Sequence, residues 1–162
     1  DFAPTPMGKH YLKLARWLDL ALPESTRPEL FITDAEQAFA DDLLKKYDIN
    51  DTEPVIGLNP GAQFGASKCW PPEYFARLAE LLQDRFNCRL LIFAGPGEDT
   101  IAEAIVSESR ADIINTAGDQ VDLARLKPMI NRCDLLITND TGPRHYAVAF
   151  DVPVVEIGRA HV

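Results

Sequence analysis

Short apolar runs alternate with amphipathic stretches from Pro54 onward, and this alternation limits the possible folds more than any other feature of the chain. The apolar runs lie at residues 55–58, 90–94, 113–114, 135–138 and 154–157, and the amphipathic stretches at 72–86, 100–107, 122–131 and 143–150. Continuous apolar runs are typical of strands buried on both faces, and single helices between them favour parallel pairing. The sequence therefore predicts a Rossmann-like, doubly wound α/β domain with a parallel sheet over residues 54–155.

A helical segment is predicted before that domain, over residues 1–53. Apolar residues recur at helical spacing in "MGKHYLKLARWLDLAL", and "DAEQAFADDLLKKY" indicates a second helix capped by Asp34. The stretch between them, "PESTRPELFIT", is linker-like. With 162 residues, 46% of them hydrophobic, the chain is long enough for one domain with a buried core and this appended segment.

Charge and composition argue against several classes of protein. A net charge of −9 disfavours a nucleic-acid partner, because binding along a phosphate backbone needs clustered Lys and Arg. The sequence has neither an apolar run of about eighteen residues nor the pattern of a signal peptide, so a cytoplasmic protein is expected. Its three cysteines have unrelated spacings and no CxxC pair, which predicts reduced thiols and no zinc site.

The first candidate binding loop is "NPGAQFGASKCWPP", residues 59–72. In doubly wound sheets, ligands bind beyond the carboxyl ends of the strands, where this loop is expected. Its glycines permit close backbone approach to an anion, and Lys68 adds a positive charge. It is not a Walker A motif, because two residues separate Gly65 from Lys68. Two interpretations stay open: a phosphate cradle, or an ordinary glycine-rich turn with a solvated lysine.

The second candidate loop is "AGPGEDT", residues 94–100. Glu98 or Asp99 could accept hydrogen bonds from ribose hydroxyls, as acidic residues do in dinucleotide sites. The alternative is that Asp99 or Thr100 is the N-cap of the next helix.

The third candidate loop opens "NDTGPRHYAVAF", residues 139–150, which follows a buried strand. Pro143 suits the first helical position, so the N–H groups of the first turn, that of His145 included, should face a ligand. Thr141 can donate to a phosphate, Asp140 can accept from sugar hydroxyls, and His145 can donate to phosphate or orient Asp140. The alternatives are a simple cap at Asp140 or Thr141 and a half-buried histidine. Together with the other two loops, the group favours a nucleotide-diphosphate site.

These motifs carry a resemblance to a known family. "NPGAQFGASKCWPPEYFARLAELL" and "TNDTGPRHYAVAFDVPVV" resemble the C-terminal, donor-binding half of glycosyltransferase family 9, the ADP-heptose:lipopolysaccharide heptosyltransferases, most nearly the heptosyltransferase II type. The resemblance covers about residues 54–155 and implies half of a two-domain GT-B enzyme, with the preceding helices as the segment between an acceptor domain and this donor domain. The residues that it implies for donor binding are Ala62, Gln63, Phe64, Lys68, Glu98, Asp140, Thr141, Gly142 and His145.

The resemblance also implies a reaction, the inverting transfer of heptose from ADP-L-glycero-D-manno-heptose to the lipopolysaccharide inner core, with no metal or other cofactor. Lys68 and Asp140 are the implied catalytic residues: Lys68, with Thr141, stabilises the departing ADP, and Asp140 contacts the heptose. The family's general base lies in the N-terminal domain, so we expect this chain alone to bind donor weakly and to transfer nothing. The implied location of the full-length enzyme is cytoplasmic, peripherally associated with the inner membrane of a Gram-negative bacterium.

Several residues depart from the family pattern. Cys69 stands where Arg is common, Arg144 where an apolar residue is common, and "GDQVD" replaces the usual "GKTSL". Residues 156–162, "EIGRAHV", can be encoded by a common sequencing-library adapter, so we expect a non-native tail there. Two other functions remain open: a nucleotide-sugar epimerase of similar two-domain shape, which would bind UDP-sugars in preference to ADP-sugars, and a nucleotide-binding module without chemistry of its own.

Overall fold

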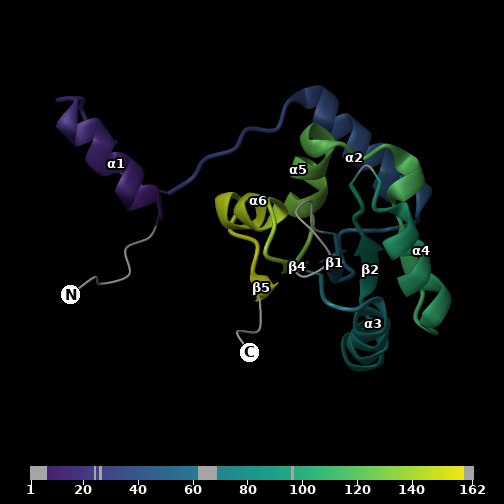
Figure 1. The fold of residues 1–162 in the computed structure, drawn as a ribbon. Coiled ribbons are helices and arrows are strands. Elements are labelled where there is room, and N and C mark those ends of the chain that lie inside the picture. Colours follow the sequence, from purple (N-terminus) through teal and green to yellow (C-terminus); the bar gives the residue numbers. More distant parts are fainter. Residues whose placement is uncertain (1–6, 24, 26, 62–68, 96, 159–162) are drawn as a thin grey trace.

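The centre of the fold is a five-stranded parallel sheet (Figure 1). The structure, a computed structural model, describes residues 7–23, 25, 27–61, 69–95 and 97–158. The strands are β1 (Val55–Asn59), β2 (Arg89–Ile92), β3 (Ile113–Asn115), β4 (Leu135–Asn139) and β5 (Val154–Ile157). Their order is β3-β2-β1-β4-β5, and every neighbouring pair is parallel. The predicted Rossmann-like, doubly wound sheet is confirmed.

Helices cover both faces of the sheet. The helices α3 (Pro72–Phe86) and α4 (Asp99–Glu108) lie on one face, and α2 (Asp34–Lys46), α5 (Leu123–Asn131) and α6 (Pro143–Ala149) lie on the other. Side chains of a strand alternate between its faces, so β1 contributes to two separate cores. Val55 packs in the core with Leu126 and Met129 of α5. Ile56 packs in the other core with Phe75 of α3. The last strand, β5, crosses the boundary expected after residue 155, since Glu156 pairs with Thr138.

The start of α2 differs from the sequence prediction. Its N-cap is Thr33, one residue before the predicted Asp34. The Glu36 N–H donates to Thr33 Oγ1 at 3.3 Å, and the Thr33 N–H donates to Glu36 Oε2 at 2.8 Å, which together form a capping box. Lys127 of α5 also contacts Glu36, with Nζ 2.9 Å from Oε2, so α2 is held to α5 at its first turn.

Gly57 in the middle of β1 is required by close packing. A Cβ at this position would lie 2.8 Å from the Phe93 ring and 3.1 Å from Cys133 Sγ. Both distances are shorter than ordinary van der Waals contact, so only glycine fits between β1 and its neighbours without a shift.

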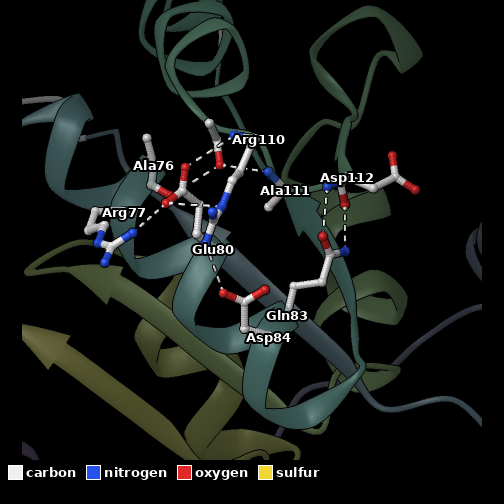
Figure 2. Close-up of polar contacts among 9 residues, drawn as sticks. Ala76, Arg77, Glu80, Gln83, Asp84, Arg110, Ala111 and Asp112 are labelled. Carbon is white, nitrogen blue, oxygen red and sulfur yellow. Dashed lines mark hydrogen bonds and ion pairs between the residues drawn. The ribbon is translucent and has the colours of Figure 1, made fainter.

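A polar network joins α3 to the turn before β3, at the amino ends of the strands (Figure 2). Glu80 accepts from Arg77 Nη1 at 2.7 Å and from the Arg110 N–H at 3.2 Å. Arg77 is the main reason that the pKa of Glu80 lies below its ordinary value. Nearby, the Asp112 N–H donates to Gln83 Oε1 at 2.9 Å. This network fixes the edge of the sheet opposite the carboxyl ends of the strands.

The first helix, α1 (Met7–Trp17), lies apart from the sheet and the other helices (Figure 1). It exposes the apolar side chains of Tyr11, Leu14 and Trp17. Within the part of the chain that the structure describes, no helix has the length and apolar character needed to span a membrane.

Candidate functional site

A cavity of about 780 Å³ opens at the carboxyl ends of β1, β2 and β4. It is lined by Asn59, Gly61, Phe93, Ala94, Gly95, Glu98, Val121, Asp122, Leu123, Ala124, Leu126, Thr141, Gly142, Pro143 and Tyr146. These residues come from the ends of β1 and β2, the loop before α4, the start of α5 and the start of α6. The three loops singled out from the sequence therefore meet at this edge of the sheet.

Buried polar side chains form the floor of the cavity where β1 meets β4. Asn59 Nδ2 donates to Thr138 Oγ1 at 3.1 Å and to Thr141 Oγ1 at 3.0 Å. Asn59 and Thr138 are also partners in the parallel register. Thr141 is thus held by the sheet and does not cap α6, whose N-cap is Gly142 with no side-chain cap bond. The alternative of a cap at Asp140 or Thr141 is wrong.

Asn139, the last residue of β4, holds both flanks of the loop that contains residues 61–69. Its Nδ2 donates to the Pro60 carbonyl at 2.6 Å, and its Oδ1 accepts from the Trp70 N–H at 3.1 Å. The Asn139 side chain is fully buried, its bond to Pro60 is buried, and its bond from the Trp70 N–H is partly buried. Ala62, Gln63, Phe64 and Lys68, all predicted to bind donor, lie outside the described residues.

Glu98 faces the cavity from the loop after β2. Its Oε2 accepts from the Gly95 N–H at 2.9 Å, and its carboxylate occupies the space that a Cβ at Gly61 would need, 1.9 Å from that position. A side chain at position 61 would therefore collide with the Glu98 carboxylate, and glycine leaves room for it. Asp99 is exposed and begins α4, whose N-cap is Glu98, so the alternative of a cap at Asp99 or Thr100 is wrong. Of the two acidic candidates, Glu98 is the one among the cavity's lining residues.

Asp140 and His145 lie beside the cavity and are not among its described lining residues. Asp140 Oδ1 pairs with Arg144 Nη1 at 2.5 Å, one turn further along α6. Arg144 Nη1 also contacts Glu156 Oε1 at 2.7 Å. His145 is exposed, so the alternative of a half-buried histidine is wrong. Its N–H donates to the Gly142 carbonyl at 3.0 Å, so that N–H does not face a ligand as predicted.

One wall of the cavity is formed by the start of α5 and is largely apolar. Leu126 is buried, but Leu123 leaves 68% of its surface exposed at the mouth of the cavity. Asp122 is the N-cap of this helix, because its Oδ1 accepts from the Arg125 N–H at 2.8 Å. The cavity thus has a polar side, at the ends of β1 and β4, and an apolar side at α5. Such a division suits a ligand with one polar and one apolar end.

Sequence reasoning missed Asn59 and Asn139 as site residues. Each is the last residue of a strand, and each has its side chain buried with hydrogen bonds to a neighbouring segment. The available signal was an amide at or just after the end of an apolar run, in "IGLN" and "LLITN". A buried amide must find hydrogen-bond partners, which at a strand end are most often the adjoining loops.

A doubly wound parallel sheet with a cavity at the carboxyl ends of its central strands places the chain in the Rossmann-like class of α/β domains. The family model described as Glycosyltransferase family 9 (heptosyltransferase) matches residues 4–161. This chain belongs to that family, and the resemblance seen in the sequence is confirmed.

Individual proteins agree with this assignment. The chain is 32% identical over 138 residues to lipooligosaccharide heptosyltransferase 2 of Haemophilus influenzae, covering 81% of this chain and 39% of that protein. The structure of a glycosyl transferase family 9 protein from Veillonella parvula matches with a TM-score of 0.85 and 26% identity, over 96% of this chain and 44% of that one. The structure of E. coli ADP-heptose LPS heptosyltransferase II matches with a TM-score of 0.69 and 27% identity, over 83% and 41%. The chain thus spans less than half the length of these relatives.

Proposed function

We propose that this chain is the donor-binding part of a heptosyltransferase, which takes heptose from ADP-L-glycero-D-manno-heptose for transfer to a lipopolysaccharide core. The observation that carries the proposal is the cavity at the carboxyl ends of β1, β2 and β4, in a chain of glycosyltransferase family 9. The name of the E. coli relative, an ADP-heptose LPS heptosyltransferase, supports this donor and this acceptor.

The proposal divides the donor between the two sides of the cavity. The diphosphate lies at the polar side, near Thr141 and Gly142, where Lys68 supplies the positive charge. Glu98 accepts from the ribose hydroxyls, and the base lies against the apolar wall formed by α5. Asp140, which lies beside the cavity, accepts hydrogen bonds from the hydroxyls of the heptose.

The reaction that we propose is a direct displacement with inversion. The hydroxyl oxygen of the acceptor forms a bond to the anomeric carbon while the bond from that carbon to the phosphate oxygen breaks, and its electron pair leaves with ADP. Negative charge therefore grows on the diphosphate, where Lys68 and the hydroxyl of Thr141 stabilise it. In this proposal a general base in the acceptor domain takes the proton of the acceptor hydroxyl. The full-length enzyme would work at the cytoplasmic face of the inner membrane, where a lipid-linked acceptor is within reach.

The test is calorimetric titration of the purified chain with ADP, UDP and GDP. We expect ADP to bind and UDP and GDP to bind at least about tenfold more weakly, a difference of about 1.4 kcal/mol. We expect EDTA to leave the affinity for ADP unchanged. Preference for UDP would favour the epimerase alternative, and absence of binding to all three nucleotides would refute the proposal.

Two variants with matched controls locate the ligand. Lys68→Ala is titrated with ADP, which tests the contact to the diphosphate. Asp140→Ala is titrated with the intact nucleotide sugar, which tests the contact to the heptose. Lys45→Ala and Asp42→Ala remove the same charges from exposed positions on α2 and should bind like the parent chain. Equal affinity of the Lys68→Ala variant and its control would show that the diphosphate is bound elsewhere.

A further inference from the structure

The apolar wall of the cavity follows a strained turn. Residues 121–124 and Leu126 line the cavity. The short 3₁₀-helix η2 (Ala117–Asp119) ends one residue before this segment. Between the two, Gln120 has a φ of 55°, in the left-handed region that residues with a side chain rarely adopt. Such a backbone persists only where its surroundings hold it, so the position of this wall depends on what fixes each side of the turn.

Asp119 fixes the turn on its N-terminal side, and both of its carboxylate oxygens have partners at the C-terminal end of α2, where Lys46 is the last helical residue and Tyr47 is the C-cap. Tyr47 OH donates to Oδ2 at 2.6 Å, and Lys46 Nζ pairs with Oδ1. The side chain of Asp119 is only 10% exposed, so these contacts are largely shielded from solvent. Asp119 raises the pKa of Lys46, and burial raises the pKa of Tyr47, so Lys46 stays charged and Tyr47 stays a donor at neutral pH.

Arg125 fixes the turn on its C-terminal side, again against α2. Its guanidinium lies 4.5 Å from the ring centre of Phe39, a cation–π contact. Its Nη1 also donates to the Gln120 carbonyl at 3.0 Å. The cavity wall is therefore held at both ends by a helix that is not part of the β-α-β repeat and that contributes no side chain to the cavity lining.

We propose that Tyr47 and Asp119 are positioning residues for the donor: their contact sets the place of the wall at residues 121–126 and so the affinity for the base of the nucleotide. The inference rests on the proposed function, because it assumes that a nucleoside diphosphate occupies this cavity. Neither residue is among the described residues that line the cavity. The polar side of the cavity is held separately, by Asn59 and Asn139 at the ends of the strands.

This separation gives a test that a general loss of stability cannot imitate. ADP would contact both sides of the cavity, whereas inorganic pyrophosphate would contact only the polar side. Tyr47→Phe removes one hydroxyl and keeps the ring, and Asp119→Asn removes the charge. We expect each to weaken ADP binding about 3- to 10-fold, the range that corresponds to the net contribution of one ordinary hydrogen bond, with the affinity for pyrophosphate changed less than about twofold.

Matched controls are Tyr11→Phe, which removes an exposed hydroxyl on α1, and Asp84→Asn, which breaks an ion pair at the opposite edge of the sheet. Both should bind ADP and pyrophosphate like the parent chain. Circular dichroism and thermal melting check that each variant is folded, and Tyr47→Phe alone decides the matter if Asp119→Asn does not fold.

The outcomes separate this inference from the proposed function. If the parent chain binds ADP and the Tyr47→Phe variant binds it equally well, the inference is overturned and the proposed function stands. Equal losses for ADP and pyrophosphate also overturn it, because the effect would then be general. Parent chain that binds neither ligand overturns the proposed function and this inference together.

Discussion

Replacement of Asn139 by Ala tests how the edge of the sheet beside the cavity is held. The amide of Asn139 is fully buried and makes two hydrogen bonds, one to the Pro60 carbonyl and one from the Trp70 N–H. Asn139→Ala removes both and leaves the two backbone groups without these partners. A buried group without a partner costs about 1–3 kcal/mol, and the partly buried Trp70 N–H costs less than the buried Pro60 carbonyl, so the loss of unfolding free energy should be about 2–4 kcal/mol. This loss is a large share of the unfolding free energy of a typical domain, which is about 5–15 kcal/mol.

The assay is urea unfolding followed by circular dichroism. With a slope of about 2 kcal/mol per molar urea, the midpoint should fall by at least about 1 M. Asn131→Ala, at an exposed position at the end of α5, is the matched control and should stay within about 0.5 kcal/mol of the parent chain. An unchanged midpoint for Asn139→Ala would refute the argument that this amide holds the loop.

A second substitution at the same site gives a pH dependence of opposite sign to that of the parent chain. In Asn139→Asp, the new carboxylate can still accept from the Trp70 N–H, but it faces the Pro60 carbonyl and can donate to it only when protonated. Burial and this carbonyl should raise the pKa of the new carboxyl group in the folded state. The folded protein then binds more protons than the unfolded one, so this contribution to stability should increase as the pH falls from 7 towards about 5.

Three further predictions concern other parts of the fold. Gly57→Ala should lower the unfolding free energy by about 1–3 kcal/mol, since its Cβ would lie 2.8 Å from the Phe93 ring. The Cys133 thiol should react with iodoacetamide only after unfolding, because burial raises its pKa to about 12. The pKa of Glu36 is lowered chiefly by Lys127, and that of Glu80 chiefly by Arg77. The ionised carboxylates should therefore stabilise the fold above about pH 4.3, and this stabilisation should be lost as the pH falls below that value. Urea midpoints measured between pH 6 and pH 3 would show the loss.

Each of these has a result that would contradict it. A Gly57→Ala chain as stable as the parent would mean that β1 and the Phe93 ring separate without cost. Rapid labelling of Cys133 in the native chain would show that its core opens on the time scale of the reaction. For the carboxylates, Glu80→Gln should reduce the acid-induced fall in the midpoint, and an unchanged fall would show that Glu80 has no part in it.

Much of the fold was accessible from local pattern, and the caps show where that pattern becomes ambiguous. Apolar runs and amphipathic stretches located every strand of the sheet and the helices between them, because burial on two faces leaves a clear trace in sequence. The start of α2 was misplaced by one residue, since both Thr33-x-x-Glu36 and Asp34-x-x-Gln37 fit the pattern of a capping box. Only the geometry of the preceding chain selects Thr33.

The site was less accessible, because its decisive contacts join residues far apart in the chain. Asn139 is 79 residues from Pro60, and they meet because β4 lies beside β1 in the strand order. Glu98 faces the cavity because Gly61 leaves room for its carboxylate. Local sequence could present Glu98 and Asp99 as equal candidates for a cap or a ribose contact, but it could not show which of them a distant glycine accommodates.

The position of α2 is the physical basis for expecting stability and binding to be coupled on one side of the cavity and separable on the other. Ala40 and Leu43 of α2 are buried in the same core as Leu126, so α2 cannot move without disturbing α5. Tyr47, the C-cap of the same helix, donates a hydrogen bond to Asp119, which lies just before the cavity wall in sequence. Removal of the Tyr47 hydroxyl should therefore act on the apolar wall through Asp119, whereas the polar floor is held by hydrogen bonds between residues at the ends of β1 and β4. This is the physical reason to compare ADP with pyrophosphate, and not to measure ADP alone, when residues of α2 are changed.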